Sequence, residues 1–263
     1  MTQAAFGAGP MAVVRDPRPR SGIADMELVW GKLASLAAGG PGELNLARPE
    51  ATAAFSRRDS RLRGYARAEA WMDSQGFSSI IRPVGGHLAA YGPGDLVIHL
   101  WAPHLGARAH IRERFGLFGD ALARALRAVG IDARVGPVPG EYCAGEFSVN
   151  DSGRAKLAGT GQRITKHGYL FSAVVMVEEA GRARSTLAGA YKMLDLDFNP
   201  ETVGCVADSA PGTTLDNVRE ALVGELYRTI PLGAGSPAPP VFSQPPREAL
   251  AAPIGTSGGS RVQ

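Results

Sequence analysis

The stretch Tyr-Leu-Phe-Ser-Ala-Val-Val-Met-Val at residues 169–177 decides the fold of this chain. Nearly every position is apolar, so both alternating faces of an extended strand would be apolar as well. Strands of this kind are covered on both sides and lie in the interior of a sheet. We therefore expect residues 169–177 to form the central strand of the main sheet.

A β-hairpin is predicted just before this strand. Glu146-Phe-Ser-Val149 and Ala155-Lys-Leu-Ala158 flank the sequence Asn-Asp-Ser-Gly at 150–153. These loop residues tolerate the left-handed backbone that hairpin turns require. Such a hairpin would bring the neighbourhood of Cys143 close to Lys156.

Segments on both sides alternate between helical and extended patterns. The predicted helices cover residues 24–38, 64–75, 118–129 and 215–226, with Gly130 ending the third and Thr213 or Thr214 beginning the last, which closes before Pro231. The predicted strands are 78–84 and 95–101, around a turn at Gly92-Pro-Gly94, and 131–135. The alternation predicts an α+β domain with a mixed sheet.

The two ends of the chain differ from this core. Residues 1–20 combine Gly, Ala, Pro and Arg without periodicity, and residues 234–263 are rich in Pro and Gly with few large apolar side chains. We expect both to be flexible tails. Between them no linker or repeat is visible. Residues 21–233 are therefore predicted to form a single catalytic domain.

The composition excludes several classes of protein. Lys and Arg number 28 against 25 Asp and Glu, a surplus too small to bind a polyanion unaided, so no nucleic-acid partner is expected. The two cysteines cannot form a disulfide framework. No apolar run approaches the ~18 residues of a membrane helix, and the N-terminus lacks a targeting pattern. We expect a cytoplasmic protein without a membrane partner.

Cys143 is the first candidate for chemistry. It lies in Pro139-Gly-Glu-Tyr-Cys-Ala-Gly145, a turn-rich segment that would expose its sulfur. A thiolate is nucleophilic near neutral pH when a nearby group favours it, although Glu141 and Glu146 would oppose ionisation. The alternative is a small half-buried thiol without a function.

Lys156 could offset these carboxylates. Facing inward on its strand, it would favour the thiolate and would also stabilise an oxygen that gains charge during acyl transfer. The alternative is an ordinary exposed strand lysine.

Other motifs carry less information. Gly85 and Gly86 lie between two strands, so they form neither a dinucleotide fingerprint nor a phosphate loop. They could let a narrow ligand lie against the backbone, with Gly159-Thr-Gly161 as a facing wall. The spacing of His99, His104 and His110 predicts no metal site. The basic run from Arg57 to Arg67 indicates a solvated face or a docking site for an acidic protein.

Two segments together carry a resemblance to a known family. Arg82-Pro-Val-Gly-Gly-His-Leu-Ala-Ala-Tyr-Gly-Pro-Gly-Asp-Leu96 is followed by Gly153-Arg-Ala-Lys-Leu-Ala-Gly-Thr-Gly-Gln-Arg163 and then by His167-Gly168. In this order they resemble the biotin/lipoate protein ligase and octanoyltransferase superfamily over roughly residues 50–230. The resemblance implies a class-II-synthetase-like core, in which a mixed, largely antiparallel sheet is flanked by helices.

The resemblance also implies roles for individual residues. Lys156 matches the active-site lysine of the superfamily. Glu141-Tyr-Cys-Ala-Gly145 is similar to the Ser-Tyr-Cys-Pro-Gly segment of its cysteine-dependent octanoyl and amido transferases, which makes Cys143 the nucleophile and leaves Cys205 as a reserve. Ala144 replaces the family's proline, and His87 replaces the third glycine of the ligases. The residues implied to frame the acyl tunnel are Arg82, Gly85, Gly86, His87, Gly159, Thr160, Gly161 and Gln162.

The implied function is acyl transfer in protein lipoylation. An octanoyl or lipoyl group would pass from acyl carrier protein or octanoylated H protein, through a Cys143 thioester, to a lysine of a lipoyl domain of a 2-oxoacid dehydrogenase or of the glycine-cleavage H protein. No cofactor or metal would be required. One alternative is a lipoate ligase that uses ATP and Mg²⁺ to form an acyl-adenylate. A second, non-enzymatic alternative is a paralogue that only binds acyl chains or lipoyl domains.

Overall fold

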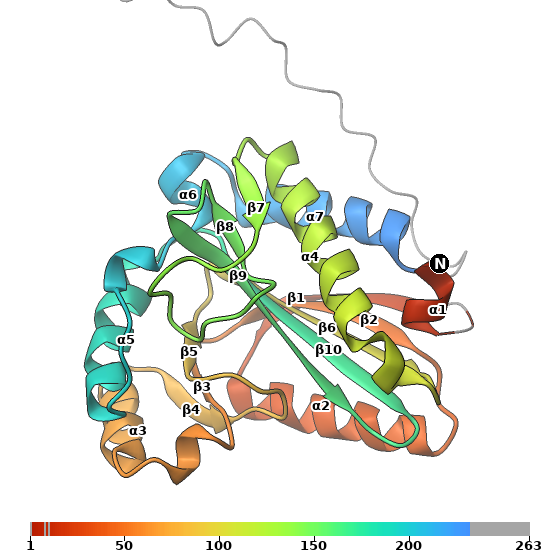
Figure 1. Cartoon of the computed structure of the whole chain (residues 1–263), viewed down its shortest axis with the longest axis horizontal. Coiled ribbons are helices and arrows are strands. Elements are labelled where there is room, and N and C mark those ends of the chain that lie inside the picture. The colour runs from red at the N-terminus through yellow and green to blue at the C-terminus, as the bar shows by residue number, and fades with distance from the viewer. Residues whose placement is uncertain (1, 8, 10, 232–263) are drawn as a thin grey trace, which may run out of the picture.

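A seven-stranded sheet forms the centre of the structure, a computed structural model that describes residues 2–7, 9 and 11–231 (Figure 1). The strands, in spatial order, are β1 (Ala12–Arg20), β2 (Glu43–Pro49), β6 (Asp95–Pro103), β10 (Gly168–Met176), β9 (Ala155–Ile164), β8 (Val149–Asp151) and β7 (Ala133–Val135). Only β1 and β2 pair in parallel within this sheet. The predicted mixed, largely antiparallel sheet is confirmed, and β10 is its middle strand, as the apolar run at 169–177 predicts.

Alternate residues of the central strands point to two different layers. Leu96, Ile98 and Leu100 of β6 are buried in the same core cluster as residues of α4 (Ile111–Ala128) and α7 (Leu215–Thr229). Val97 and Trp101 lie on the other face, in core clusters with a second sheet and with α2 (Gly22–Ala37). Helices therefore cover both faces, and β6 and β10 are apolar on both sides for this reason.

A smaller three-stranded sheet lies beside the main one, in the order β4-β3-β5. Its strands are β3 (Thr52–Phe55), β4 (Ser78–Ile81) and β5 (Ala89–Tyr91). Two helices, α3 (Tyr65–Ser74) and α5 (Gly181–Met193), pack against it (Figure 1). The prediction that strands 78–84 and 95–101 surround the Gly92–Gly94 turn is corrected here, because β5 precedes this turn and β4 belongs to the smaller sheet.

Short helices connect these elements. They are α1 (Thr2–Phe6), α6 (Val206–Ser209) and the 3₁₀ turns η1 (Asp59–Arg61), η2 (Ala107–His110) and η3 (Pro200–Thr202). Among the residues described by the structure, no helix has the length and apolar character needed to cross a membrane.

The predicted hairpin and the last helix have the expected local chemistry. Ser152 and Gly153 adopt φ angles of +54° and +77° in the loop between β8 and β9. Asn150 Oδ1 accepts a hydrogen bond from the Gly153 N–H at 2.7 Å. Thr214 caps α7 by accepting from the Asn217 N–H at 3.2 Å. These turn and cap residues are recognisable from the sequence because their partners lie only three positions away.

The expectation of a flexible tail over residues 1–20 is corrected by β1. This strand contains Pro17 and Pro19 but lies at the edge of the sheet, where a missing N–H leaves no neighbouring strand unpaired. Arg15 pairs with Glu220 at 3.0 Å, and Arg20 donates to Asn45 Oδ1 at 2.9 Å. Long-range contacts of this kind order a segment that has no periodicity. The predicted tail at 234–263 lies outside the described residues.

Candidate active site

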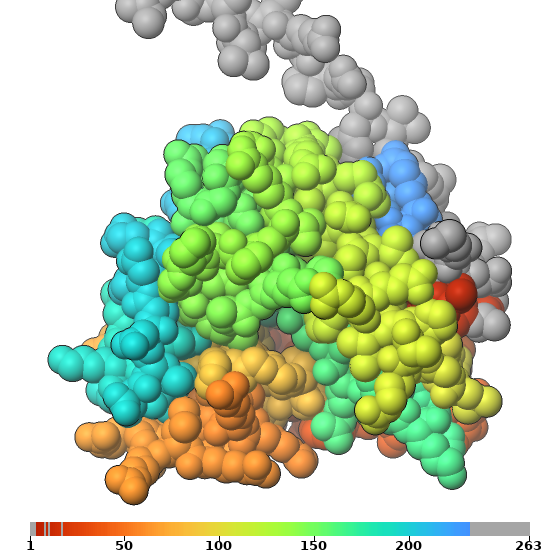
Figure 2. All heavy atoms as spheres, in the orientation of Figure 1, coloured from red at the N-terminus to blue at the C-terminus, as the bar shows by residue number. Residues whose placement is uncertain are grey.

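A cavity of about 290 Å³ lies between the main sheet and the smaller sheet. The surface is hollowed where the loop after β4, the loop before β8 and the start of α4 meet (Figure 2). Most of its lining is apolar, and the polar side chains that reach it include Arg82, His99, Lys156, Thr160, Gln162 and Ser172. The sulfur-bearing residue Cys143 also lines it. The cavity is therefore an apolar slot with a small number of polar groups, which is the usual character of a small-molecule site.

Cys143 lies in the loop before β8 with a left-handed backbone, φ +44°. Its N–H donates to Tyr191 Oη at 2.8 Å, and this hydroxyl donates in turn to the Leu88 carbonyl at 2.8 Å. A non-glycine residue in this region of φ is strained and persists only where its surroundings hold it. The half-buried cysteine is thus presented to the cavity by a fixed loop.

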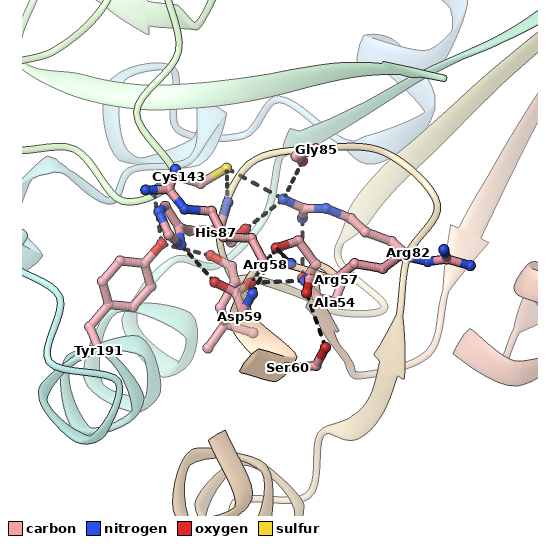
Figure 3. Close-up of polar contacts among 12 residues, drawn as sticks. Ala54, Arg57, Arg58, Asp59, Ser60, Arg82, Gly85, His87, Cys143 and Tyr191 are labelled. Atoms are coloured by element: carbon pink, nitrogen blue, oxygen red, sulfur yellow. Dashed lines mark hydrogen bonds and ion pairs between the residues drawn. The ribbon is translucent and has the colours of Figure 1, made fainter. Parts of the chain in front are cut away.

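Two donors converge on the Cys143 sulfur (Figure 3). Arg82 Nη2 lies 3.4 Å from Sγ, and the His87 backbone N–H donates to Sγ at 3.2 Å. The same guanidinium nitrogen donates to the Gly85 carbonyl at 3.1 Å and to the His87 carbonyl at 2.5 Å. Burial raises the pKa of the Cys143 thiol, but Arg82, Lys156 and the His87 N–H outweigh it and hold that pKa below the ordinary value of 9.0. These contacts favour the thiolate form of Cys143.

Lys156 faces inward, as the sequence analysis predicts, and its side chain is only 2% exposed. Its Nζ donates to the Cys143 carbonyl at 2.8 Å and to the Tyr142 carbonyl at 3.1 Å, and it lies 3.7 Å from Glu141 Oε1. Burial lowers the pKa of the Lys156 ammonium, although the Cys143 and Glu141 charges oppose this. The lysine therefore joins the loop that carries Cys143 to β9.

The two neighbouring carboxylates have different places. Glu141 is buried, and its Oε1 accepts from the Gly145 N–H at 2.8 Å and from the Ser148 hydroxyl at 2.7 Å. Glu146 is exposed and pairs with Arg112, at 2.8 Å for one of their two contacts. Each of the two carboxylates has its own cation, Lys156 for Glu141 and Arg112 for Glu146, and neither is among the main groups that shift the pKa of the Cys143 thiol.

Glycines shape both walls of the cavity. Gly86 has φ +95°, and a Cβ there would lie 2.6 Å from Cys143 Sγ. A Cβ on Gly161 would lie 2.9 Å from a methyl group of Val84, so this glycine lets β9 approach the facing loop. Gly85, Gly159 and Thr160 also line the cavity, as expected.

The side chain of Gln162 forms hydrogen bonds with the start of α4. Its amide donates to the Ile111 carbonyl at 2.9 Å, and its oxygen accepts from Arg114 Nε at 2.9 Å. Both hydrogen bonds tie β9 to the start of α4, so Gln162 shapes the wall of the cavity.

The structure shows the His87 ring held by Asp59, and its role in substrate binding stays a prediction. His87 is not among the cavity-lining residues, and its Nδ1 lies 2.6 Å from Asp59 Oδ1. Asp59 is fully buried, and its Oδ2 accepts from the Ser56 N–H at 2.8 Å and the Ser56 hydroxyl at 3.0 Å. The sequence analysis missed Asp59, because its neighbours in the basic run suggest a solvated segment. An acidic residue inside such a run is the signal that could have found it.

The arginines around Asp59 form an exposed basic patch, consisting of Arg57, Arg58, Arg61, Arg63 and Arg67. Within the described part of the chain, none of these five side chains makes an ion pair. The patch surrounds η1, whose Asp59 reaches the site through His87.

Cys205 lies apart from this arrangement. It precedes α6, is only 1% exposed and does not line the cavity. Burial raises the pKa of its thiol to about 11. Its backbone N–H donates to Asp208 Oδ2 at 3.0 Å, which places a carboxylate beside it. Neither its position nor its environment favours the reserve assignment as nucleophile.

His99 is held in a buried network. Its Nε2 lies 2.9 Å from Asp25 Oδ2, and its Nδ1 lies 2.9 Å from the Ser172 hydroxyl. Across the described ranges, no group of three or more His, Cys, Asp and Glu side chains is arranged to hold a metal ion.

Solved structures of similar fold include lipoate ligases. A bi-partite lipoate protein ligase of Thermoplasma acidophilum is 20% identical, with a TM-score of 0.62 over 84% of this chain and 83% of the other. A T. acidophilum protein with bound lipoic acid is 20% identical, with a TM-score of 0.62 over 84% of this chain and 86% of the other. A lipoate-protein ligase A bound with ATP is 19% identical, with a TM-score of 0.61 over 86% of this chain and 88% of the other. At these identities the likeness establishes the fold.

The sequence itself assigns the family. A search of curated protein sequences found no significant match. Residues 57–226 match the lipoyl protein ligase A/B catalytic domain, and this range is more than half of the 263 residues. The chain therefore belongs to the lipoyl protein ligase A/B catalytic-domain family.

Proposed function

We propose that this protein is an acyltransferase that moves an octanoyl or lipoyl group through a Cys143 thioester onto a lysine of a lipoyl domain or glycine-cleavage H protein. The observation that carries the proposal is the sulfur itself. Cys143 Sγ lies at an apolar cavity, 3.4 Å from the Arg82 guanidinium and 3.2 Å from the His87 backbone nitrogen. A thiolate held in this way is a nucleophile that requires no further activation.

In the first half-reaction the Cys143 thiolate attacks the carbonyl carbon of an acyl thioester on the donor. A new C–S bond forms, the donor's C–S bond breaks, and the released donor thiolate takes a proton from water. Arg82 and Lys156 lower the pKa of the Cys143 thiol, and we propose that their positive charge also stabilises the oxygen that becomes negative in the tetrahedral intermediate. In other acyl-transfer enzymes one such donor is worth about 10²–10³ in rate.

In the second half-reaction the amine of the acceptor lysine attacks the Cys143 thioester. A C–N bond forms, the C–S bond breaks, and the thiolate returns to its partners Arg82 and His87. Exchange of one thioester for another is nearly neutral in free energy, and conversion to an amide is downhill. The proposed reaction therefore requires no nucleotide cofactor and no metal.

The cavity supports a single acyl chain as the ligand. Its volume of about 290 Å³ is at the lower end of the ~300–1,000 Å³ of typical ligand pockets. Its walls are mainly apolar, which suits an alkyl chain, and Cys143 lines it where a carbonyl group would react. We propose acyl carrier protein or octanoylated H protein as the donor. The exposed basic patch beside η1 favours acidic partners of this kind.

An ATP-dependent lipoate ligase is the second candidate. It is favoured by the similar fold of a lipoate-protein ligase A that was solved with bound ATP. In this alternative Lys156 would bind an acyl-adenylate, Mg²⁺ would accompany the nucleotide, and Cys143 would have no chemical role. The T. acidophilum ligase was described together with its E2 lipoyl domain, so both candidates use the same class of acceptor.

Intact-mass spectrometry after mixing the protein with octanoyl carrier protein, without ATP, separates these candidates. We expect an octanoyl adduct on the peptide that contains Cys143, its absence in Cys143→Ala, and its retention in Cys205→Ala. Pyrophosphate release that depends on free lipoate, with no adduct, would support the ligase instead. Binding of acyl chains or lipoyl domains with neither adduct nor product would support a binding paralogue.

A further inference from the structure

The second half-reaction of the proposed function needs a proton acceptor. An acceptor lysine is an ammonium near neutral pH, because its ordinary pKa is about 10.4, and it must lose a proton before it can attack. Lys156 cannot easily take that proton, since its Nζ already donates to the Tyr142 and Cys143 carbonyls and lies 3.7 Å from Glu141 Oε1. Arg82 is a guanidinium and stays protonated. The groups that activate the sulfur therefore provide no base.

The Asp59–His87 pair has the chemistry that is missing. Asp59 Oδ2 accepts two hydrogen bonds from Ser56, so the carboxylate acts as an acceptor. Its Oδ1 lies 2.6 Å from His87 Nδ1, which must then carry the proton of the neutral ring. This arrangement fixes the tautomer and leaves the lone pair of Nε2 available to take a proton.

The position of His87 links this pair to the nucleophile. Its backbone N–H donates to Cys143 Sγ at 3.2 Å, so the residue that carries the ring contacts the sulfur directly. The side chain is 19% exposed, so solvent can exchange protons with it. Figure 3 shows the ring between the Cys143 loop and Asp59.

We propose that His87 is the general base of the second half-reaction and that Asp59 is its positioning residue. His87 Nε2 takes one proton from the acceptor ammonium, and the resulting amine attacks the Cys143 thioester carbon. The C–N bond forms, the C–S bond breaks, and the amide nitrogen loses its second proton to water. The His87 imidazolium then releases its proton to solvent, and the Cys143 thiolate is restored.

Other charged groups lie close to this pair and enter its pH dependence. Arg82 contacts the His87 carbonyl, and the Cys143 sulfur contacts the His87 amide. Arg57 and Arg58 precede Asp59 on the same turn (Figure 3). These cations are present in every variant below, and Cys143 is acylated at the start of transfer in each of them, so a change in the pH dependence of transfer reports on the imidazole.

The test measures the two half-reactions separately with the full chain. Acyl-enzyme formation is followed by intact mass with octanoyl carrier protein, and transfer is followed by mixing the isolated acyl-enzyme with a lipoyl domain. In His87→Ala we expect transfer to slow about 10²-fold and by far more than acylation, since general bases contribute about 10²–10⁴-fold. Transfer should also lose the acidic limb of its pH profile and recover when imidazole is added.

Two further variants complete the test. Asp59→Asn should slow transfer, because an amide no longer fixes the tautomer of the His87 ring. If the Asp59→Asn protein fails to fold, His87→Gln tests the loss of the imidazole with a polar side chain in its place. His110→Ala is the matched control, because His110 Nδ1 also contacts a carboxylate, Glu113, at 2.8 Å, whereas it is His87 whose backbone N–H contacts the Cys143 sulfur. Equal slowing of both half-reactions, or normal transfer in His87→Ala, would overturn the role of His87. Failure of the wild-type protein to form an adduct would instead overturn the proposed function.

Discussion

The two cysteines of this chain occupy opposite environments. Cys143 lines a cavity beside a guanidinium, an ammonium and a backbone N–H, and these lower the pKa of its thiol even though burial opposes them. Cys205 is buried next to Asp208, and burial raises the pKa of its thiol to about 11. The comparison shows that burial beside a carboxylate keeps a thiol protonated, and that nearby cations lower the pKa of a thiol in spite of its burial.

The largest expected effect separates the two cysteines directly. Cys143→Ala should lower octanoyl transfer by at least about 10³-fold, since loss of a nucleophile removes the covalent route. Cys205→Ala should transfer at nearly the wild-type rate and lose only stability. The measurement is the initial rate of lipoyl-domain acylation, with circular dichroism to verify that both variants fold. Comparable losses in the two variants would erase the distinction drawn here.

Lys156 should matter more for the stability of the Cys143 loop than any exposed lysine. Lys156→Met leaves the buried Glu141 carboxylate without its cation, and breaking a buried pair in this way costs about 3–5 kcal/mol. Denaturant unfolding measures this change in the free energy of unfolding. Lys166→Met, at an exposed position, is the control and should change it by less than about 0.5 kcal/mol. A loss of similar size in both variants would mean that Lys156 does not hold the loop.

Arg82 should set the reactivity of the Cys143 thiol. A hydrogen bond to a charged group is worth about 1.5–3 kcal/mol, so Arg82→Gln should slow alkylation of Cys143 at neutral pH by about 10–100-fold. The matched control is Arg184→Gln, because Arg184 donates to the Val203 carbonyl at 2.7 Å, close to Cys205, without contacting that sulfur. Alkylation by iodoacetamide with peptide mass spectrometry gives both rates. If the alkylation rate of Cys143 is unchanged in Arg82→Gln, groups other than Arg82 stabilise the thiolate.

The smallest expected effect concerns the exposed basic patch. The double variant Arg63→Glu, Arg67→Glu should raise KM for the acidic carrier a few-fold at low salt, with little change in kcat, because exposed charges steer association. The difference should shrink as salt is added. Arg228→Glu, at an exposed position on α7, is the control. A KM that is unaffected at low salt would remove the patch from partner docking.

Prediction from the sequence succeeds where the signal is local. The apolar run at 169–177 and the Thr214 cap are found where they are expected, because each depends on residues only a few positions apart. The predicted hairpin also forms, but its first strand is 149–151 in place of 146–149 and its loop is 152–154 in place of 150–153. Helix α5 was not predicted, and neither was β1. Tertiary packing decides both segments, which show no strong periodicity of their own.

In the site, too, contacts between residues near each other in the sequence could be predicted, and contacts between distant residues could not. The approach of Cys143 to Lys156 follows from the hairpin and could be predicted. The contact between Arg82 and the sulfur joins residues 61 positions apart, and the contact between His87 and Asp59 joins residues 28 apart. Tyr191, which holds the Cys143 loop, comes from the unpredicted helix α5. Only the folded chain brings these groups together.

The most direct test of the central claim is the pH dependence of alkylation at both cysteines in one sample of the wild-type protein. Because the pKa of Cys143 lies below the ordinary 9.0, its thiolate persists as pH falls below that value and is lost only as pH falls through the lowered pKa. We expect Cys143 to be alkylated readily at neutral pH, while Cys205, with a pKa of about 11, stays unmodified. Alkylation of Cys143 that begins only near pH 9, or in parallel with Cys205, would contradict the account.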